Sequence, residues 1–328
     1  MRSLKLAIGA GLLAGVMAAG TLPAAAAEQF PDKPIRLVVP WVPGGFTDML
    51  ARLVAEKMTK SLGQTVLVEN RPGANGMIGT DSVAKAAPDG HTILIATADT
   101  HAINPFIYSK VPYDAVKDFA PIGMVVSAPL ILSTYTQSPE KTFAELTANA
   151  KKSPGRYKYA SWGEGSTGHL AMELFNSPAG ISMIHVPYKG TGGAITDVMA
   201  GRVDLILVTL LTGDPFFKSN RLRGLAVTSP QRLPLVPDLP TVAESGYPGY
   251  DVALWYALVA PGATPAPVVE KLNAALRDVL KDTEFQARML GSGVDILAGS
   301  PAEAARYIAR ERVKWEGAAK SANVKLDR

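Results

Sequence analysis

The residues best suited to chemistry stand in three glycine-rich turns, each of which follows an apolar run and opens an amphipathic one. The turns are Pro43 to Asp48 (PGGFTD), Trp162 to Gly168 (WGEGSTG) and Tyr188 to Gly193 (YKGTGG). A strand that enters a helix through such a turn leaves the first N–H groups of the helix unpaired at the carboxyl end of the strand. Small anions bind to such groups. The spacing therefore predicts an anion-binding cleft, although Gly-Gly before a helix also serves as a plain tight turn.

The second turn also matches a dinucleotide-binding fingerprint. Gly163, Gly165 and Gly168 have the spacing Gly-x-Gly-x-x-Gly. That fingerprint requires an acidic residue about 20 positions later to hold the ribose hydroxyls. This chain has Pro-Tyr-Lys at 187–189 instead. We therefore expect no nicotinamide cofactor and keep only the anion-binding helix start.

Patterns that would indicate catalysis are weak. Ser166 lacks the leading glycine of a nucleophile elbow, because the residue two positions before it is a glutamate. The four histidines show no metal-ligand spacing on one helix, and the chain has no cysteine. Asp48 and Asp204 could serve as acid and base, but helix-cap and strand-end roles explain them. We expect neither catalysis nor a metal site, and structural hydrogen bonds for His101 and His169 at turns facing the cleft.

The first 27 residues are typical of an export signal. Arg2 and Lys5 form a basic start, an apolar run follows from Leu6 to Thr21, and three alanines at 25–27 match a cleavage site. A membrane anchor is the alternative, but the alanine-rich end disfavours it. No later apolar run is long enough to span a bilayer. We expect a mature protein in the periplasm, with no disulfide and no lipid-modified cysteine.

The amino-acid composition excludes further classes of protein. The whole chain of 328 residues has 33 basic and 29 acidic side chains. Removing the signal takes away two basic residues and leaves a net charge of +2. No stripe of Lys and Arg with interleaved aromatics is present, so nucleic acid is not an expected partner. About 300 residues are typical of two α/β lobes rather than one small core.

Apolar periodicity predicts alternating strands and helices with short connections, the pattern of parallel sheets. In the first part we expect strands at 35–39, 66–69 and 91–96 and helices at 47–62 and 77–87. Two apolar runs, 122–126 and 130–133, are interpreted as separate crossing strands. Beyond them we expect helices at 143–152, 168–175 and 193–201, and strands at 157–161, 182–187, 203–210 and 222–228. After these we expect a surface connection at 230–248, a strand at 252–260 and helices at 267–280 and 301–322.

Several longer blocks occur in a fixed order from residue 29 to the end. They are 29–40 with the Pro-Gly-Gly-x-x-Asp turn, 68–74 (VENRPGA), 87–90 (APDG), 100–105 (THAINP), 185–190 (HVPYKG) and 240–246 (PTVAESG). In these blocks the chain resembles the Bug family, the periplasmic solute-binding proteins of tripartite tricarboxylate transporters.

The resemblance implies an α/β fold of two lobes, each a sheet flanked by helices, with the ligand cleft between them. Lobe 1 would comprise residues 28–128 plus 250–328, and lobe 2 residues 129–249, after a signal peptide at 1–27. The expected ligand is a small carboxylate, held by backbone N–H groups, hydroxyls and ordered water without an arginine. The expected partners are the membrane permease subunits of such a transporter; we also expect a monomer without a cofactor. A ligand sensor that contacts a signalling receptor is the alternative, and a hydrolase on the same lobes would need a base and nucleophile that the chain lacks.

Position by position, the resemblance assigns ligand contacts to four places. They are Pro43, Gly44, Gly45, Phe46, Thr47 and Asp48; Ala98, Asp99 and Thr100; Ser166, Thr167 and His169; and Gly190 and Thr191.

Three departures from the family pattern bear on the ligand. Phe46 replaces a small residue, Val208 replaces an aspartate, and Asp99 stands where small hydroxyl residues are common. An aspartate there would repel a nearby carboxylate unless it faces an amine, a cation or water. Phe46, Trp41 and Val208 predict an apolar carboxylate, aromatic acids included. Alternatively, Trp41 and Phe46 only pack at the hinge side of the cleft.

Overall fold

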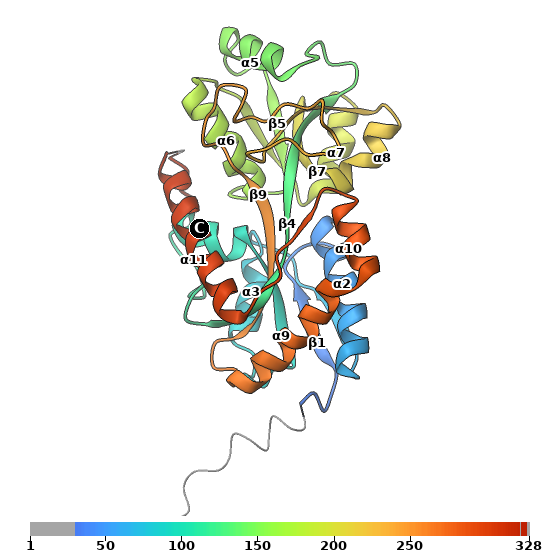
Figure 1. Ribbon diagram of the computed structural model, residues 1–328. Coiled ribbons are helices and arrows are strands. Elements are labelled where there is room, and N and C mark those ends of the chain that lie inside the picture. Colours follow the sequence, from blue (N-terminus) through green and yellow to red (C-terminus); the bar gives the residue numbers. More distant parts are fainter. Residues whose placement is uncertain (1–29, 322, 327–328) are drawn as a thin grey trace, which may run out of the picture.

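The computed structural model describes residues 30–321 and 323–326 (Figure 1). The expected signal peptide at 1–27 lies outside this range. The strands are β1 Ile35–Val39, β2 Val66–Asn70, β3 Thr92–Thr97, β4 Phe119–Tyr135, β5 Lys158–Ser161, β6 Ile184–Pro187, β7 Leu205–Thr209, β8 Leu222–Val227, β9 Ala253–Pro261 and β10 Asp295–Ile296. The helices are α2 Phe46–Leu62, α3 Met77–Ala84, the π-helix η1 Asp99–Ile103, α4 Asn104–Ile107, α5 Phe143–Lys152, α6 Thr167–Ala179, α7 Thr191–Met199, α8 Leu210–Lys218, α9 Ala266–Lys281, α10 Thr283–Leu290 and α11 Pro301–Ser321.

The strands join in one path, in the order β2-β1-β3-β9-β4-β7-β5-β6, with β8 and β10 also paired to β4. At one end β1 lies parallel to β2 and β3, and at the other β5 lies parallel to β6 and β7. The antiparallel pair β4 and β9 runs through the middle and connects the two halves (Figure 1). Each half is therefore a small sheet, and β4 has paired strands in both halves.

The two apolar runs that we expected to be separate strands are one strand, β4, so that prediction is wrong. β4 pairs with β9 as far as Pro129, and with β7 and β8 from Leu130 onward. Proline has no N–H for a sheet hydrogen bond, and it stands here where the neighbouring strands change. The apolar pattern is interrupted at this exchange of partners while the chain itself stays extended. The lobe limits at 128 and 250 remain a prediction.

Helices cover both faces of the first half. Figure 1 shows α2, α9 and α10 on one side of the strands and α11 on the other. α11 contacts β4, η1 and α6. Two indoles that are at most 1% exposed, Trp255 and Trp315, both donate to the carboxylate of Glu311 at 3.0 Å, which fastens this last helix to the central strands.

Four helices of the described residues were not among the expected elements: η1, α4, α8 and α10. α8 contains Gly213 and Pro215, both of which disfavour a helix, yet the side chain of Thr209 caps its start. α10 follows α9 directly, with Asp282 as its N-cap and Phe285 and Met289 buried. α3 ends three residues earlier than expected, ahead of Pro88. None of the helices within the described residues is long and apolar enough to cross a membrane.

Candidate ligand-binding site

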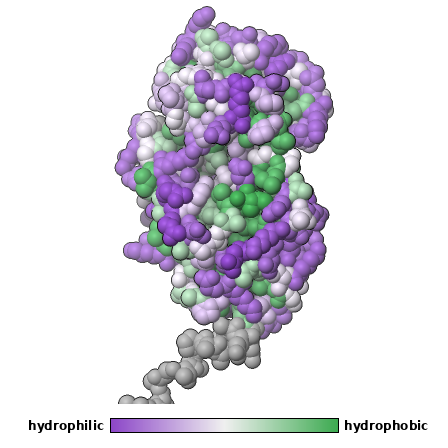
Figure 2. Space-filling model, viewed as in Figure 1, coloured by the Kyte–Doolittle hydropathy of each residue, from purple (hydrophilic) through white to green (hydrophobic). Residues whose placement is uncertain are grey.

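A pocket of about 1040 Å³ lies between the two halves, next to β4 and β9. Figure 2 shows hydrophobic residues around a hollow at this level of the molecule. Eleven of the residues that we expected to bind ligand line it: Trp41, Pro43, Gly44, Gly45, Phe46, Thr47, Ala98, Asp99, Gly190, Thr191 and Val208. Five others do not: Asp48, Thr100, Ser166, Thr167 and His169.

The start of α2 forms one wall. Its N-cap is Gly45, which supplies no side chain, so the N–H groups of the first turn remain available at the pocket surface. The carboxylate of Asp48 turns away from the pocket and accepts hydrogen bonds from the Gly44 N–H at 3.1 Å and the Asn70 side chain at 2.9 Å. These bonds place the Asp48 side chain at the back of the turn, outside the lining of the pocket.

Electrostatics support this position for Asp48. Burial alone would raise the pKa of the carboxyl, but hydrogen bonds from Arg52, Gly44 and Asn70 outweigh it and hold the pKa below its usual range. The group is therefore ionised at neutral pH. It fixes the loop that presents the α2 start, because it ties that loop to the end of β2 and to α2 itself.

The start of α7 faces the pocket from the other half. Its N-cap, Gly190, has φ 112°, a backbone conformation that favours glycine, and no side chain caps the helix. A Cβ at this position would lie 3.0 Å from Cγ2 of Val42, which belongs to the first half. Thr191, Gly192 and Gly193 continue the lining. The first turn of α7 thus approaches the α2 loop across the pocket.

At the start of α6, side chains of the protein itself accept hydrogen bonds from the N–H groups that a ligand could otherwise bind. The side chain of Ser166 caps the helix, and the carboxylate of Asp99 accepts from the Thr167 N–H at 2.5 Å and from the Thr167 hydroxyl at 3.1 Å. Ser166 and Thr167 are completely buried and lie behind the lining. Only the loop before the helix reaches the pocket, through Trp162, Gly163 and Glu164.

The histidines near the pocket have structural roles. His169 Nδ1 accepts from the Gly165 N–H at 3.1 Å, and its ring stacks on His185 with centroids 3.9 Å apart. Burial lowers the pKa of His169, and burial together with His169 lowers the pKa of His185 to about 3. The stacked pair is therefore neutral at pH 7. His169 holds the loop before α6 and is not part of the pocket lining.

Thr100 and His101 are buried behind the other wall. The Thr100 hydroxyl accepts from the Thr97 N–H at 3.1 Å and lies 2.9 Å from His101 Nδ1. Burial, with a smaller effect of Arg312, lowers the pKa of His101 to about 3. Thr100 therefore shapes the turn that carries Asp99 and does not face the pocket. The structural hydrogen bonds that we expected for His101 and His169 are present.

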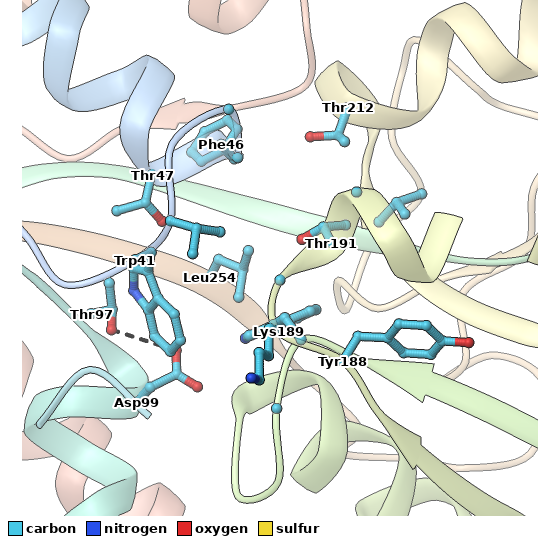
Figure 3. A pocket seen from close by; sticks show the side chains of 18 of the residues that line it. Trp41, Phe46, Thr47, Thr97, Asp99, Tyr188, Lys189, Thr191, Thr212 and Leu254 are labelled. Carbon is cyan, nitrogen blue, oxygen red and sulfur yellow. Dashed lines mark hydrogen bonds between the residues drawn. The ribbon is translucent and has the colours of Figure 1, made fainter. Parts of the chain in front are cut away.

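Much of the remaining wall is apolar. The ring of Phe46 is 7% exposed, lines the pocket and lies 5.2 Å from the ring of Tyr256. Figure 3 shows Trp41, Phe46 and Leu254 on one side of the pocket, and Tyr188, Lys189, Thr191 and Thr212 across from them. Phe46 therefore both packs against the central strands and faces the pocket.

Charged side chains are few in the lining. They are Asp99, Glu164 and Lys189, and no arginine is among them. Lys189 is exposed and has no ion pair within the part of the chain that the structure describes. No group of three His, Asp or Glu side chains in residues 30–321 and 323–326 could hold a metal ion.

Asp204 lies outside the pocket. Its carboxylate accepts from the Lys158 N–H at 2.7 Å, in agreement with the expected strand-end role.

Several lining residues were absent from our prediction. They include Tyr188 and Lys189, the α8 residues Thr212, Pro215 and Phe216, and Tyr256 of β9. Lys189 stands within a glycine-rich turn that the sequence had already singled out. The α8 residues were missed because the helix was missed. For β9, apolar alternation does not show which end of a strand borders a cleft.

The profile of the Tripartite tricarboxylate transporter family receptor matches residues 50–324. The chain belongs to this family. A curated relative of this receptor family, the UPF0065 protein in the tcbD-tcbE intergenic region of a Pseudomonas species, is 37% identical over 309 residues, which are 93% of this chain and 92% of that protein. Protein BugT of Bordetella pertussis is 33% identical over 312 residues, 95% and 96% of the two chains.

Solved structures of receptor-family proteins share the fold. R. palustris Rpa4515 with adipate has a TM-score of 0.87 and 36% identity and covers 91% of this chain and 100% of its own. The periplasmic binding protein BugD has a TM-score of 0.85 and 36% identity, with the same coverage. MatC from Rhodopseudomonas palustris with bound malate has a TM-score of 0.82 and 32% identity, over 88% and 99% of the chains. The resemblance to the Bug family and the two-lobe α/β fold of periplasmic binding proteins are therefore confirmed.

Proposed function

We propose that this protein captures a small carboxylate with an apolar or aromatic body in the periplasm and delivers it to the membrane permease subunits of a tripartite tricarboxylate transporter. In this proposal it acts as a monomer after loss of its signal peptide, and it performs no catalysis. One observation carries the proposal: the uncapped starts of α2 and α7 face the same pocket from opposite halves.

Two helix starts can replace a cationic side chain. Each contributes roughly 0.3–1 kcal/mol to a nearby anion, and more where the site is partly buried. The N–H groups of the first turn add directed hydrogen bonds. A carboxylate placed between Gly45 and Thr191 would therefore be held without an arginine, in keeping with a lining that contains none.

The walls favour a ligand body that is not strongly polar. Phe46, Val208 and Phe216 line the pocket, with Leu254 and Tyr256 from the central strand. Burying an apolar group against such a surface gains roughly 25 cal/mol per Å² removed from water. Rpa4515 and MatC are similar proteins whose structures contain adipate and malate, and both compounds belong in a test panel with aromatic and branched acids.

The test is the melting temperature of the mature protein, refolded free of ligand, with aliphatic, hydroxylated, amino and aromatic carboxylates. A ligand at about 100 times its dissociation constant adds roughly 2.7 kcal/mol to the free energy of unfolding. We expect the largest shift with an apolar or aromatic carboxylate. No shift with any carboxylate would rule out the proposed binding function.

A further inference from the structure

Four helices, α2, α6, α7 and α8, begin beside the pocket. The starts of α6 and α8 are occupied by side chains of the protein itself, and at α8 that side chain is its cap, Thr209. α2 and α7 begin at glycines that provide no side-chain cap. The N-cap of α6 is Ser166, whose side chain accepts from the His169 N–H. The N–H of the first helical residue, Thr167, donates to the Asp99 carboxylate. The protein thus places one of its own carboxylates where a helix start would otherwise be open to an anion.

The carboxylate of Asp99 comes from the opposite half of the molecule. It stands in the first turn of η1, 68 positions before Thr167, and it is 3% exposed. One oxygen accepts both bonds from Thr167, and the other accepts from the Thr97 hydroxyl at 3.4 Å. No basic side chain of the described residues forms an ion pair with it. Figure 3 shows Asp99 and Thr97 at the pocket margin.

Asp99 also lines the pocket, whereas Thr167 behind it does not. The side chain therefore separates the pocket from the first turn of α6. A ligand carboxylate that approached this end would meet a buried negative charge instead of free N–H groups. Like charges brought together in a site with little water are strongly unfavourable.

We propose that Asp99 acts as a specificity-determining residue that excludes a second carboxylate, so that the protein selects monocarboxylates over dicarboxylates of equal length. The inference rests on the proposed carboxylate-binding function. The ligand's single carboxylate occupies the space between α2 and α7, and its uncharged end lies toward Asp99. Lys189 is the basic side chain of the lining, but it is exposed to water and cannot offset a charge buried beside Asp99.

Titration calorimetry at pH 8 with hexanoate and adipate tests this, because both acids have six carbons and differ by one carboxylate. The mature wild-type protein is compared with Asp99→Ser, which opens the α6 start, and with Asp99→Asn, which removes the charge at nearly constant volume. Asp295→Ser, at an exposed position of β10 outside the pocket, controls for the change in net charge.

We expect the wild type and the Asp295→Ser control to bind hexanoate at least about tenfold more tightly than adipate. In both Asp99 variants the ratio of the adipate to the hexanoate dissociation constant should fall by a similar factor or reverse. Equal affinities in the wild type, or an unchanged ratio in the folded Asp99 variants, would overturn the inference and leave the proposed function standing. Absence of binding for every carboxylate in wild type and variants would overturn both. Melting curves of each variant establish that it is folded.

Discussion

At the scale of single residues, two aspartates have opposite pKa shifts: Asp99, which lines the pocket, and Asp48, which lies behind the loop that lines it. Hydrogen bonds outweigh burial at Asp48 and lower its pKa, whereas burial prevails at Asp99 and raises the pKa to about 6. The difference follows from their partners. Asp48 has a guanidinium, an amide and an N–H, while Asp99 has one N–H and two hydroxyls.

The raised pKa of Asp99 makes stability depend on pH. Because the folded state binds the proton more tightly than the unfolded chain, the stabilising contribution is complete below about pH 4 and is lost as the pH rises through about 6. We expect Asp99→Asn to be more stable than the wild type above pH 7, by an amount on the order of 3 kcal/mol at most, and the difference to shrink toward pH 4. Melting curves from pH 4 to 8, with Asp295→Asn as control, measure it; a constant difference across this range would contradict the assignment.

Asp48 offers a second test at this scale. Asp48→Ala removes the acceptor for the Gly44 N–H and should loosen the loop before α2. We expect the dissociation constant for the best carboxylate to rise about fivefold, since one helix start contributes roughly 1 kcal/mol. Asp81→Ala on α3, whose partner Lys85 lies on the surface, is the matched control. Unchanged affinity in calorimetry would remove the α2 start from the site.

At the scale of elements, the site depends on which helix starts lack a capping side chain. It also depends on α8, a helix that the local sequence pattern does not predict. α2 and α7 were visible in the sequence through their glycine turns, and α6 was equally visible, yet only its preceding loop reaches the pocket. α8 was not visible, because glycine and proline inside a segment argue against a helix. Packing against β7 and β8 overrides that preference.

α8 also supplies an aromatic wall that can be tested. Phe216 lines the pocket and also packs against one hydrophobic core, whereas its neighbour Phe217 packs against two cores and is not part of the lining. We expect Phe216→Ala to weaken binding of an aromatic acid by at least about tenfold and that of a short aliphatic acid by less, because the lost ring contact is worth roughly 1–2 kcal/mol. Phe217→Ala should lower the melting temperature with a smaller effect on that selectivity. Equal loss for both acids in Phe216→Ala would count against an aromatic subsite.

At the scale of the whole molecule, β4, β9 and α11 hold the two halves together. Glu311 of α11 accepts from the buried indoles of Trp255 on β9 and Trp315 on its own helix. Further links cross between the halves: Tyr250 donates to the Ala171 carbonyl at 3.0 Å, and the Asn75 side chain donates to the Gly165 carbonyl at 3.1 Å. α11 therefore packs onto the first half, where it contacts β4 and η1.

Loss of Glu311 should destabilise the entire fold. Glu311→Ala leaves two buried indole N–H groups without an acceptor, and each costs roughly 1–3 kcal/mol. We expect the free energy of unfolding to fall by about 2–4 kcal/mol, and Glu311→Gln, which keeps an acceptor oxygen, to lose much less. Chemical denaturation measures both. Similar losses in the two variants would show that the indole hydrogen bonds are not the cause.

The sequence by itself determined the order of most elements, the three glycine turns and the family, because periodicity, caps and motif blocks are local properties of the chain. It also placed eleven of the expected residues where they line the pocket. The tertiary structure alone decided that β4 is continuous and that α8 forms a wall, since both depend on neighbouring strands. It also decided which helix starts stay open: the Asp99 carboxylate reaches Thr167 only because the starts of η1 and α6, distant in sequence, meet beside the pocket.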